Sequence, residues 1–326
     1  MRLLFFTDSH IRTASMRSRL DSIQDALEDK FREVAEIART CEVDAILHGG
    51  DLFDRPDVSV LTVTRFAGIF SEFPAPLYII AGNHDIYAHN PKTLPRTMLG
   101  LLSALDVLHL IEDEGVVLEN DCKVQLSAAP FRYDIDRGER NSYLVKRSAP
   151  DVDWHLLMVH GMLLPKPFLA DISHTVISDL PELDADIVLA GHYHNGFEPV
   201  ESKGTLFLNP GSLLRTSNSK IDMQRTPQVL LLDLKKDGQK EFRMIPLRSA
   251  KPGEEVLSRA DLTEHQMRQE NLEQFKLLVR EHVDLERYDI YQMLEEIAKQ
   301  EDFAQDIVKD AVHRLSQTEA TDGEED

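Results

Sequence analysis

The sequence of 326 residues holds only two cysteines, Cys41 and Cys122, and no long apolar run. Two cysteines so placed match neither a metal-binding spacing nor the disulfide framework of a secreted protein, which favours a reducing cytoplasm. No stretch approaches the roughly 18 apolar residues of a membrane span, and no charged and then apolar leader opens the chain. We therefore expect a cytoplasmic protein that makes no membrane contact.

Basic residues are also few relative to acidic ones: 36 Lys and Arg stand against 57 Asp and Glu, a formal net charge of -21. Residues 251–326 carry 21 of the 57 acidic and 9 of the 36 basic side chains. The net charge is therefore -12 in this segment and -9 over the first 250 residues. Such a surface disfavours tight, salt-driven binding of nucleic acid by the whole molecule. It leaves open DNA held in a local groove, where bound divalent cations and a few arginines reverse the potential.

Apolar sequence is plentiful, since hydrophobic residues make up 42% of the chain, enough for a full core. Apolar runs and amphipathic helical patterns alternate from the start. In chain order, strand and helix alternate over residues 2–7, 20–38, 43–47, 59–70 and 77–81. This βαβαβ order predicts a parallel central sheet.

The pattern then becomes richer in strands. A helix is expected over residues 93–105. The later strands are expected at residues 107–110, 115–118, 123–127, 154–159, 185–190, 205–208, 228–234 and 241–247. These elements predict an α/β fold with a two-sheet β-sandwich core, the sheets face to face, flanked by helices.

A proline–glycine pair, Pro252-Gly253, and a change to helical periodicity indicate a domain boundary. Beyond it we expect two or three amphipathic helices, whose apolar stripes either pack within the protein or form a docking face for another subunit. We predict a first domain over residues 1–250, a C-terminal helical appendage over 251–316 and an acidic, disordered tail over 317–326.

Polar side chains suited to metal binding follow five of the predicted strands. They are Asp8, His10, Asp51, Asn83, His84, His160, His192 and His194. Open α/β sheets place their sites beyond the carboxyl ends of strands. Carboxylates, an amide oxygen and imidazoles are ligands for Mn, Fe or Zn, and no thiolate competes. Asp51 is the candidate to be shared by two ions, because its strand lies between the other two early ones.

Two ions that share a carboxylate can hold phosphoryl oxygens, lower the pKa of a bound water and steady the attacking and departing oxygens. The set therefore predicts hydrolysis of a phosphoester. Each motif alone is more often a turn or a structural histidine, and the argument depends on five in the same context. His89, His109 and His174 lack that context and are interpreted as structural. His48 is interpreted as a packing residue beside the Asp51 turn; the alternative is that it supports the metal ligands from behind.

Five sequence blocks together resemble the calcineurin-like metallophosphoesterases. They are Asp8-x-His10, Gly50-Asp51-x-x-Asp54-Arg55, Gly82-Asn83-His84-Asp85, His160-Gly161 and Gly191-His192-x-His194. The Met1-Arg2-Leu3-Leu4 start, the Gly50-Asp51-Leu52-Phe53-Asp54 block and the Asn209-Pro210-Gly211-Ser212 turn are also similar to SbcD-type DNA repair exonucleases. The resemblance implies the αββα metallophosphoesterase fold and a nuclease domain over residues 1–250.

The resemblance also implies roles for single residues. One metal ion would be held by Asp8, His10, Asp51 and His194, and a second by Asp51, Asn83, His160 and His192. The ions would be Mn²⁺, with Fe, Zn or Mg as alternatives. His84 would face the scissile phosphate and protonate the leaving oxygen or stabilise the transition-state charge, Asp54 would orient His84 through a hydrogen bond, and Arg55 would contact phosphate.

The implied function is a Mn-dependent DNA nuclease that works as a homodimer with an SbcC-like coiled-coil ATPase bound by the C-terminal helices. The alternative is the same chemistry on a small phosphoester, a nucleotide or a phosphoprotein. Two departures from the family matter. Archaeal and eukaryotic members carry histidine where this chain has Asp54, and the short sequence after Lys251 leaves little room for the family's capping domain.

Overall fold

The structure is a computed structural model. It describes residues 1–259 except 17, 113–114, 138–140 and 170–171, together with 267, 268, 271, 272 and 274. The chain divides into two compact units, Met1–Ser258 and Arg259–Asp326. Most of the predicted helical appendage and the whole acidic tail lie outside the described residues, so both stay predictions. The described helices include none that is long and apolar enough to cross a membrane.

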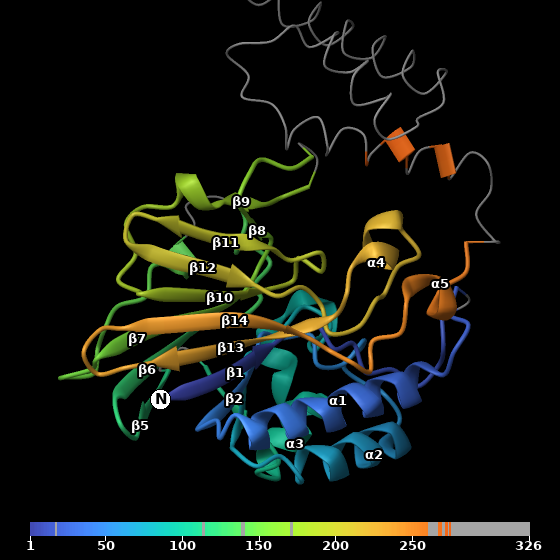
Figure 1. The fold of residues 1–326 in the computed structure, drawn as a ribbon, viewed down its shortest axis with the longest axis horizontal. Helices are drawn as coiled ribbons and strands as arrows, with labels where there is room; N and C mark the ends of the chain where they lie inside the picture. Colours follow the sequence, from blue (N-terminus) through green and yellow to red (C-terminus); the bar gives the residue numbers. More distant parts are fainter. Residues whose placement is uncertain are drawn as a thin grey trace, which may run out of the picture. The chain divides into compact units, whose positions relative to one another are not determined.

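Two six-stranded sheets form the centre of the first unit (Figure 1). The first sheet has the order β14-β13-β1-β2-β3-β4. Its strands are β1 (Arg2–Phe6), β2 (Ala45–His48), β3 (Leu77–Ile79), β4 (His109–Leu110), β13 (Gln228–Leu234) and β14 (Lys240–Pro246). Strands β1 to β4 are parallel, as predicted, but β13 joins β1 antiparallel and β14 joins β13 antiparallel. The central sheet is therefore mixed, because a late hairpin completes its edge.

The second sheet has the order β11-β12-β10-β7-β6-β5. Its strands are β5 (Val116–Glu119), β6 (Lys123–Ala129), β7 (Trp154–His160), β10 (Ile187–Gly191), β11 (Phe197–Ser202) and β12 (Thr205–Asn209). The four inner strands are parallel, and β5 and β11 pair antiparallel at the edges. The sequence analysis did not predict β11, because its edge position leaves it half exposed and without an apolar run.

Three α-helices cover the outer face of the first sheet (Figure 1). They are α1 (Ile23–Thr40), α2 (Val60–Phe70) and α3 (Met98–Ala104), each capped at its N-terminus by a serine or threonine hydroxyl. The single helix predicted over residues 93–105 is divided into a 3₁₀ segment, Pro91–Arg96, and α3. Pro95 and the capping Thr97 cause the division, because proline breaks helical hydrogen bonding and a capping residue starts a new helix.

Leucine, isoleucine, methionine and phenylalanine side chains of both sheets fill the space between them, among them Leu3 and Phe5 of β1 and Met158 of β7. The outer face of the second sheet is covered by 3₁₀ turns at Asn141–Tyr143 and Ile177–Asp179 and by a small sheet of β8 (Leu163–Leu164) and β9 (Thr175–Val176). The predicted fold class, two sheets face to face flanked by helices, is confirmed.

The first unit ends a few residues beyond the predicted boundary. Two short helices, α4 (Lys220–Gln224) and α5 (Gly253–Val256), lie near its end. Leu257 is 2% exposed and forms a β-bridge with Arg19. The last residues of the unit are therefore anchored to the segment before α1.

Candidate metal centre

Tight turns in a rare backbone conformation follow the strands that carry the predicted ligands. The φ angles are 54° at Asp8, 46° at His10, 53° at Asp51 and 72° at His192, all in the left-handed region. Asp, Asn and His tolerate this region better than other residues with side chains, and strain of this kind concentrates at functional sites. The main chain of Asp8 donates to the Gly50 carbonyl at 3.1 Å, which ties the turn after β1 to the turn after β2.

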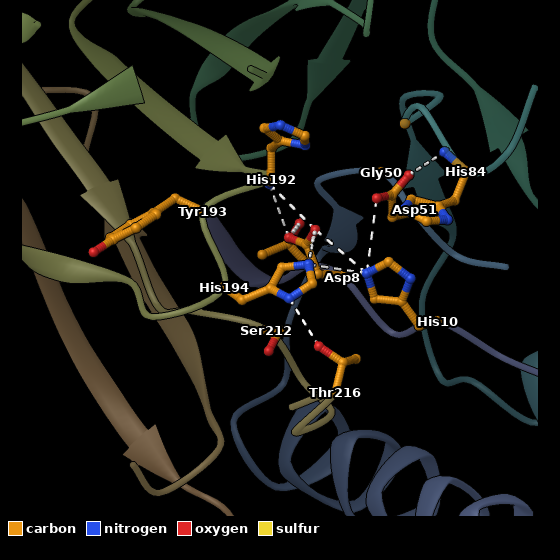
Figure 2. A network of polar contacts seen from close by, with 12 residues as sticks. Asp8, His10, Gly50, Asp51, His84, His192, Tyr193, His194, Ser212 and Thr216 are labelled. Carbon is orange, nitrogen blue, oxygen red and sulfur yellow. Dashed lines mark hydrogen bonds and ion pairs between the residues drawn. The ribbon is translucent and has the colours of Figure 1, made fainter. Parts of the chain in front are cut away.

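Four of the predicted ligands converge in a first cluster of Asp8, His10, Asp51 and His194, with one ligand atom of each within 4.8 Å of the others (Figure 2). The Nε2 atoms of His10 and His194 are 3.0 Å apart. His10 Nε2 is 3.7 Å from Asp51 Oδ2, and His194 Nε2 is 3.4 Å from Asp8 Oδ1. Carboxylates and imidazoles gathered this closely could hold one divalent ion between them.

Asp51 also belongs to a second cluster, with His160 and His192. His160 Nε2 lies 3.3 Å from Asp51 Oδ2 and 3.2 Å from Asn83 Oδ1. The structure thus brings together all seven residues predicted to bind metal, with Asp51 common to both groups. That these seven residues bind metal stays a prediction.

Hydrogen bonds behind the imidazoles test whether this donor set fits two ions. His160 Nδ1–H donates to the Gly49 carbonyl at 2.8 Å, and His194 Nδ1 is hydrogen-bonded to Thr216 Oγ1 at 3.0 Å. The carbonyl of Gly49 can only accept, so a neutral His160 turns its Nε2 lone pair toward Asn83 Oδ1, and His194 brings its Nε2 within 3.0 Å of His10 Nε2. Facing lone pairs need a shared proton or a cation between them, so the residues fit divalent ions.

The electrostatics of the two clusters follow from burial and from two carboxylates. Burial lowers the pKa of His10 and of His192 to about 4, which keeps both imidazoles neutral. Burial opposes ionisation of Asp8 and Asp51, but the facing histidines outweigh it and hold the pKa of both carboxyls below the usual range. At His160 burial is likewise outweighed, since Asp51 and Asp8 raise its pKa to about 9. The carboxylates thus attract positive charge to this point.

His84 lies exposed at the rim of the clusters. Its main-chain N–H donates to Asp51 Oδ1 at 2.8 Å (Figure 2), and its Nδ1–H donates to the main-chain carbonyl of Asp54 at 2.9 Å. The predicted hydrogen bond from Asp54 is therefore made by its main chain. Its carboxylate pairs with the Arg12 guanidinium, whose charged N–H groups are strong donors to a carboxylate.

Arg55, the predicted phosphate contact, and His48, the predicted packing residue, lie outside the two clusters. The Arg55 side chain is 65% exposed and its Nε donates to Asp57 at 2.9 Å. His48 is fully buried; its Nδ1 accepts from the Gly50 N–H at 3.2 Å and its Nε2 contacts Ser9 Oγ at 2.8 Å. His48 therefore supports the turns that carry the clusters as well as packing against Phe6.

Sequence reasoning assigned no role to three residues that hold the site together. Asp85 accepts main-chain N–H groups of Gly82 at 2.9 Å and Phe53 at 3.0 Å, joining the turns after β2 and β3. Burial and the Asp51 charge raise the pKa of Asp85 to about 7. Asp85 could have been found from its place in the Gly-Asn-His-Asp block. Arg12 and Thr216 carry no sequence signal, since their partners are known only once the chain has folded.

The fold and the clustered ligands define the class to which the chain belongs. Its residues 1–196 match the sequence profile of the calcineurin-like phosphoesterases, and the chain belongs to this family. Within the described residues, the family's divalent metals have candidate ligand groups at Asp8, His10, Asp51 and His194 and at Asp51, His160 and His192.

Particular relatives are more distant. The chain is 21% identical over 216 residues to the DNA double-strand break repair protein Mre11 of Methanococcus maripaludis, covering 65% of this chain and 57% of the relative. It is 25% identical over 233 residues to the protein of that name from Sulfolobus acidocaldarius, covering 70% of this chain and 56% of the relative. The chain thus spans little more than half the length of these relatives. A dimetal phosphatase structure from Danio rerio covers 75% of this chain and 96% of its own, with 13% identity and a TM-score of 0.48.

Proposed function

We propose that this protein is a DNA nuclease that hydrolyses phosphodiester bonds with two divalent ions, Mn²⁺ in the cell. The observation that carries the proposal is the place of Asp51 in both ligand clusters, whose atoms lie within 4.8 Å of one another in each. A shared carboxylate is the arrangement that two-metal hydrolysis requires. The DNA substrate is proposed from the similarity to the two repair proteins named above.

Each ion has its own proposed set of ligands. Asp8, His10, Asp51 and His194 would hold one ion, and Asp51, Asn83, His160 and His192 the other. When bound, the ions would supply an activated water and neutralise the phosphoryl oxygens. Gly49 and Thr216 keep the rings of His160 and His194 oriented for this task.

His84 is proposed as the residue that acts on the leaving oxygen. Because its Nδ1 proton is held by the Asp54 carbonyl, the other ring nitrogen, Nε2, is left to protonate the leaving oxygen at the exposed rim of the site. Asp54 is proposed to position His84 through its main chain while its carboxylate holds Arg12. Arg55 is proposed to reach a more distant phosphate of the substrate, after release from Asp57.

We further propose a homodimer, supported by the apolar residues that α2 and α3 expose, and an SbcC-like coiled-coil ATPase as partner of the residues after Ser258. The second candidate function is hydrolysis of a small phosphoester, a nucleotide or a phosphoprotein. The net charge of -21 favours this alternative, because it repels a long polyanion.

Degradation of linear double-stranded DNA by the full chain with Mn²⁺ tests the proposal. We expect cleavage by the wild type, and a loss of about 10² to 10⁴ in rate for His84→Ala with both ions retained by elemental analysis. His109→Ala, at an exposed histidine on β4, is the matched control and should cleave normally. Hydrolysis of small phosphoesters alone, with every metal tried, would reject the DNA substrate and favour the second candidate.

A further inference from the structure

Two buried cations away from the metal centre have no carboxylate partner among the described residues. Lys30 of α1 and Arg215, which follows β12, are each 5% exposed. Arg215 donates only to neutral carbonyls, those of Arg225 and Lys251, at 2.6 to 2.9 Å. Within the described part of the chain, Lys30 Nζ has neither a hydrogen bond nor an ion pair. Buried charges of one sign are costly unless an opposite charge is supplied.

The neighbouring acids are engaged or solvated and do not supply that charge. Asp21 pairs with Arg19 at 2.7 Å, and Asp222 pairs with Arg225 at 2.9 Å. Asp29 is exposed to water. Burial, and after it the charges of Arg19 and Arg215, lower the pKa of Lys30 to about 8, while Asp21 and Asp29 act against this shift.

A single cavity of about 170 Å³ joins these groups. Lys30, Arg215 and Arg19 line it, and so do Ser22 and Ala26 at the first turn of α1. Three carboxylates line it as well: Asp21 pairs with Arg19, Asp25 pairs with Arg65 at 2.6 Å, and Asp29 is exposed to water. The amino end of a helix carries a partial positive charge that favours anions. The cavity is smaller than the roughly 300 Å³ at which pockets for drug-sized ligands begin, so it suits a small anion.

We propose that this cavity binds a phosphate group, at a site separate from the metal centre. A phosphate carries between about 1.5 and 2 negative charges at neutral pH, which would balance the two unpaired cations. Its oxygens accept hydrogen bonds on all sides, and both the guanidinium of Arg215 and the ammonium of Lys30 bind such oxygens. The source is either inorganic phosphate or the phosphomonoester end of a larger molecule.

Thermal unfolding of the full, metal-loaded chain tests the site with inorganic phosphate as the first probe and methyl phosphate as the second. A phosphate concentration about a hundred times Kd should raise the melting temperature of the wild type by about 4–5 °C over chloride of equal ionic strength. Lys30→Met replaces the buried charge by an apolar chain of similar length. Lys236→Met, at an exposed lysine outside the cavity, is the control.

The proposal expects Lys236→Met to respond to phosphate like the wild type, and Lys30→Met to lose most of the shift while melting no lower than the wild type in chloride. A response of Lys30→Met equal to that of the wild type would place all binding at the metal centre and overturn the proposal. A wild type that melts at the same temperature in phosphate as in chloride of equal ionic strength would also overturn it. Methyl phosphate as effective as phosphate assigns a phosphomonoester end, and an effect of inorganic phosphate alone assigns the free ion. Lys30→Gln replaces Lys30→Met if the latter does not fold.

Discussion

Gly50 occupies a position where both backbone conformation and space exclude a side chain. Its φ is +98°, and a Cβ there would lie 2.4 Å from His160 Nδ1 and 3.0 Å from the Gly82 nitrogen. His160 Nδ1 is the atom that donates to the Gly49 carbonyl. A methyl group at Gly50 would therefore displace the ring from its place beside Asp51.

The chain offers a matched comparison for this residue. Gly204 has a similar φ of +84°, but a Cβ there would meet nothing within 4 Å. Both alanine variants bear the left-handed strain of roughly 1–2 kcal/mol. We expect only Gly50→Ala to lose metal at the second cluster and to lose at least about 10² in hydrolysis rate. Elemental analysis and hydrolysis of a chromogenic diester measure this, with circular dichroism as the folding control; two bound ions and normal hydrolysis in Gly50→Ala would contradict it.

At the scale of elements, α2 and α3 expose apolar side chains on the outer side of the first sheet. Val60 and Leu61 in the first turn of α2 are 69% and 82% exposed, and Leu101 and Leu105 at the end of α3 are 43% and 63% exposed. Single exposed apolar residues are ordinary, and these four are the side chains through which the proposed dimer would form. A second copy of the chain is the partner proposed above.

Leu61→Glu should convert the proposed dimer into a monomer, because a charge at a buried apolar contact is costly. Stability of the monomer should change by no more than about 0.5 kcal/mol, since the side chain is exposed in the single chain. Light scattering after size exclusion measures the mass. Val117→Glu changes an exposed apolar residue of β5 and should leave the dimer intact. A wild type that is already monomeric at micromolar concentration would reject the dimer.

At the scale of the whole molecule, the division after Ser258 predicts which part can be removed. Val256 and Leu257 are 4% and 2% exposed, and the Ser258 N–H donates to the Ser18 carbonyl at 2.7 Å. We expect a chain ending at Ser258 to fold and to hydrolyse a small diester, but not to bind the proposed ATPase. A chain ending at Glu254 should melt at a lower temperature, because it loses two buried side chains. Co-purification measures partner binding; equal binding by the chain ending at Ser258 would reject the assignment of the partner to the C-terminal residues.

Much of the fold and the ligand set could be predicted because the signals are local. The apolar runs of β2 and β7 and the three- and four-residue periodicity of α1 depend on neighbours in sequence, and so does the placing of Asp8 or His84 directly after a strand. The antiparallel hairpin of β13 and β14 could not be placed, because its pairing with β1 joins residues more than two hundred positions apart.

The sequence by itself determined the α/β class, the order of the main elements and the identity of the residues gathered at the strand ends, because each depends on patterns within a few residues. Tertiary structure alone decided that the Asp54 carboxylate turns to Arg12, that Thr216 holds His194, and that Lys30 and Arg215 share a cavity. These contacts join segments far apart in the chain. A side chain's partner is set by packing in three dimensions, where burial makes an unpaired charge expensive and the geometry of the fold determines which groups can reach it.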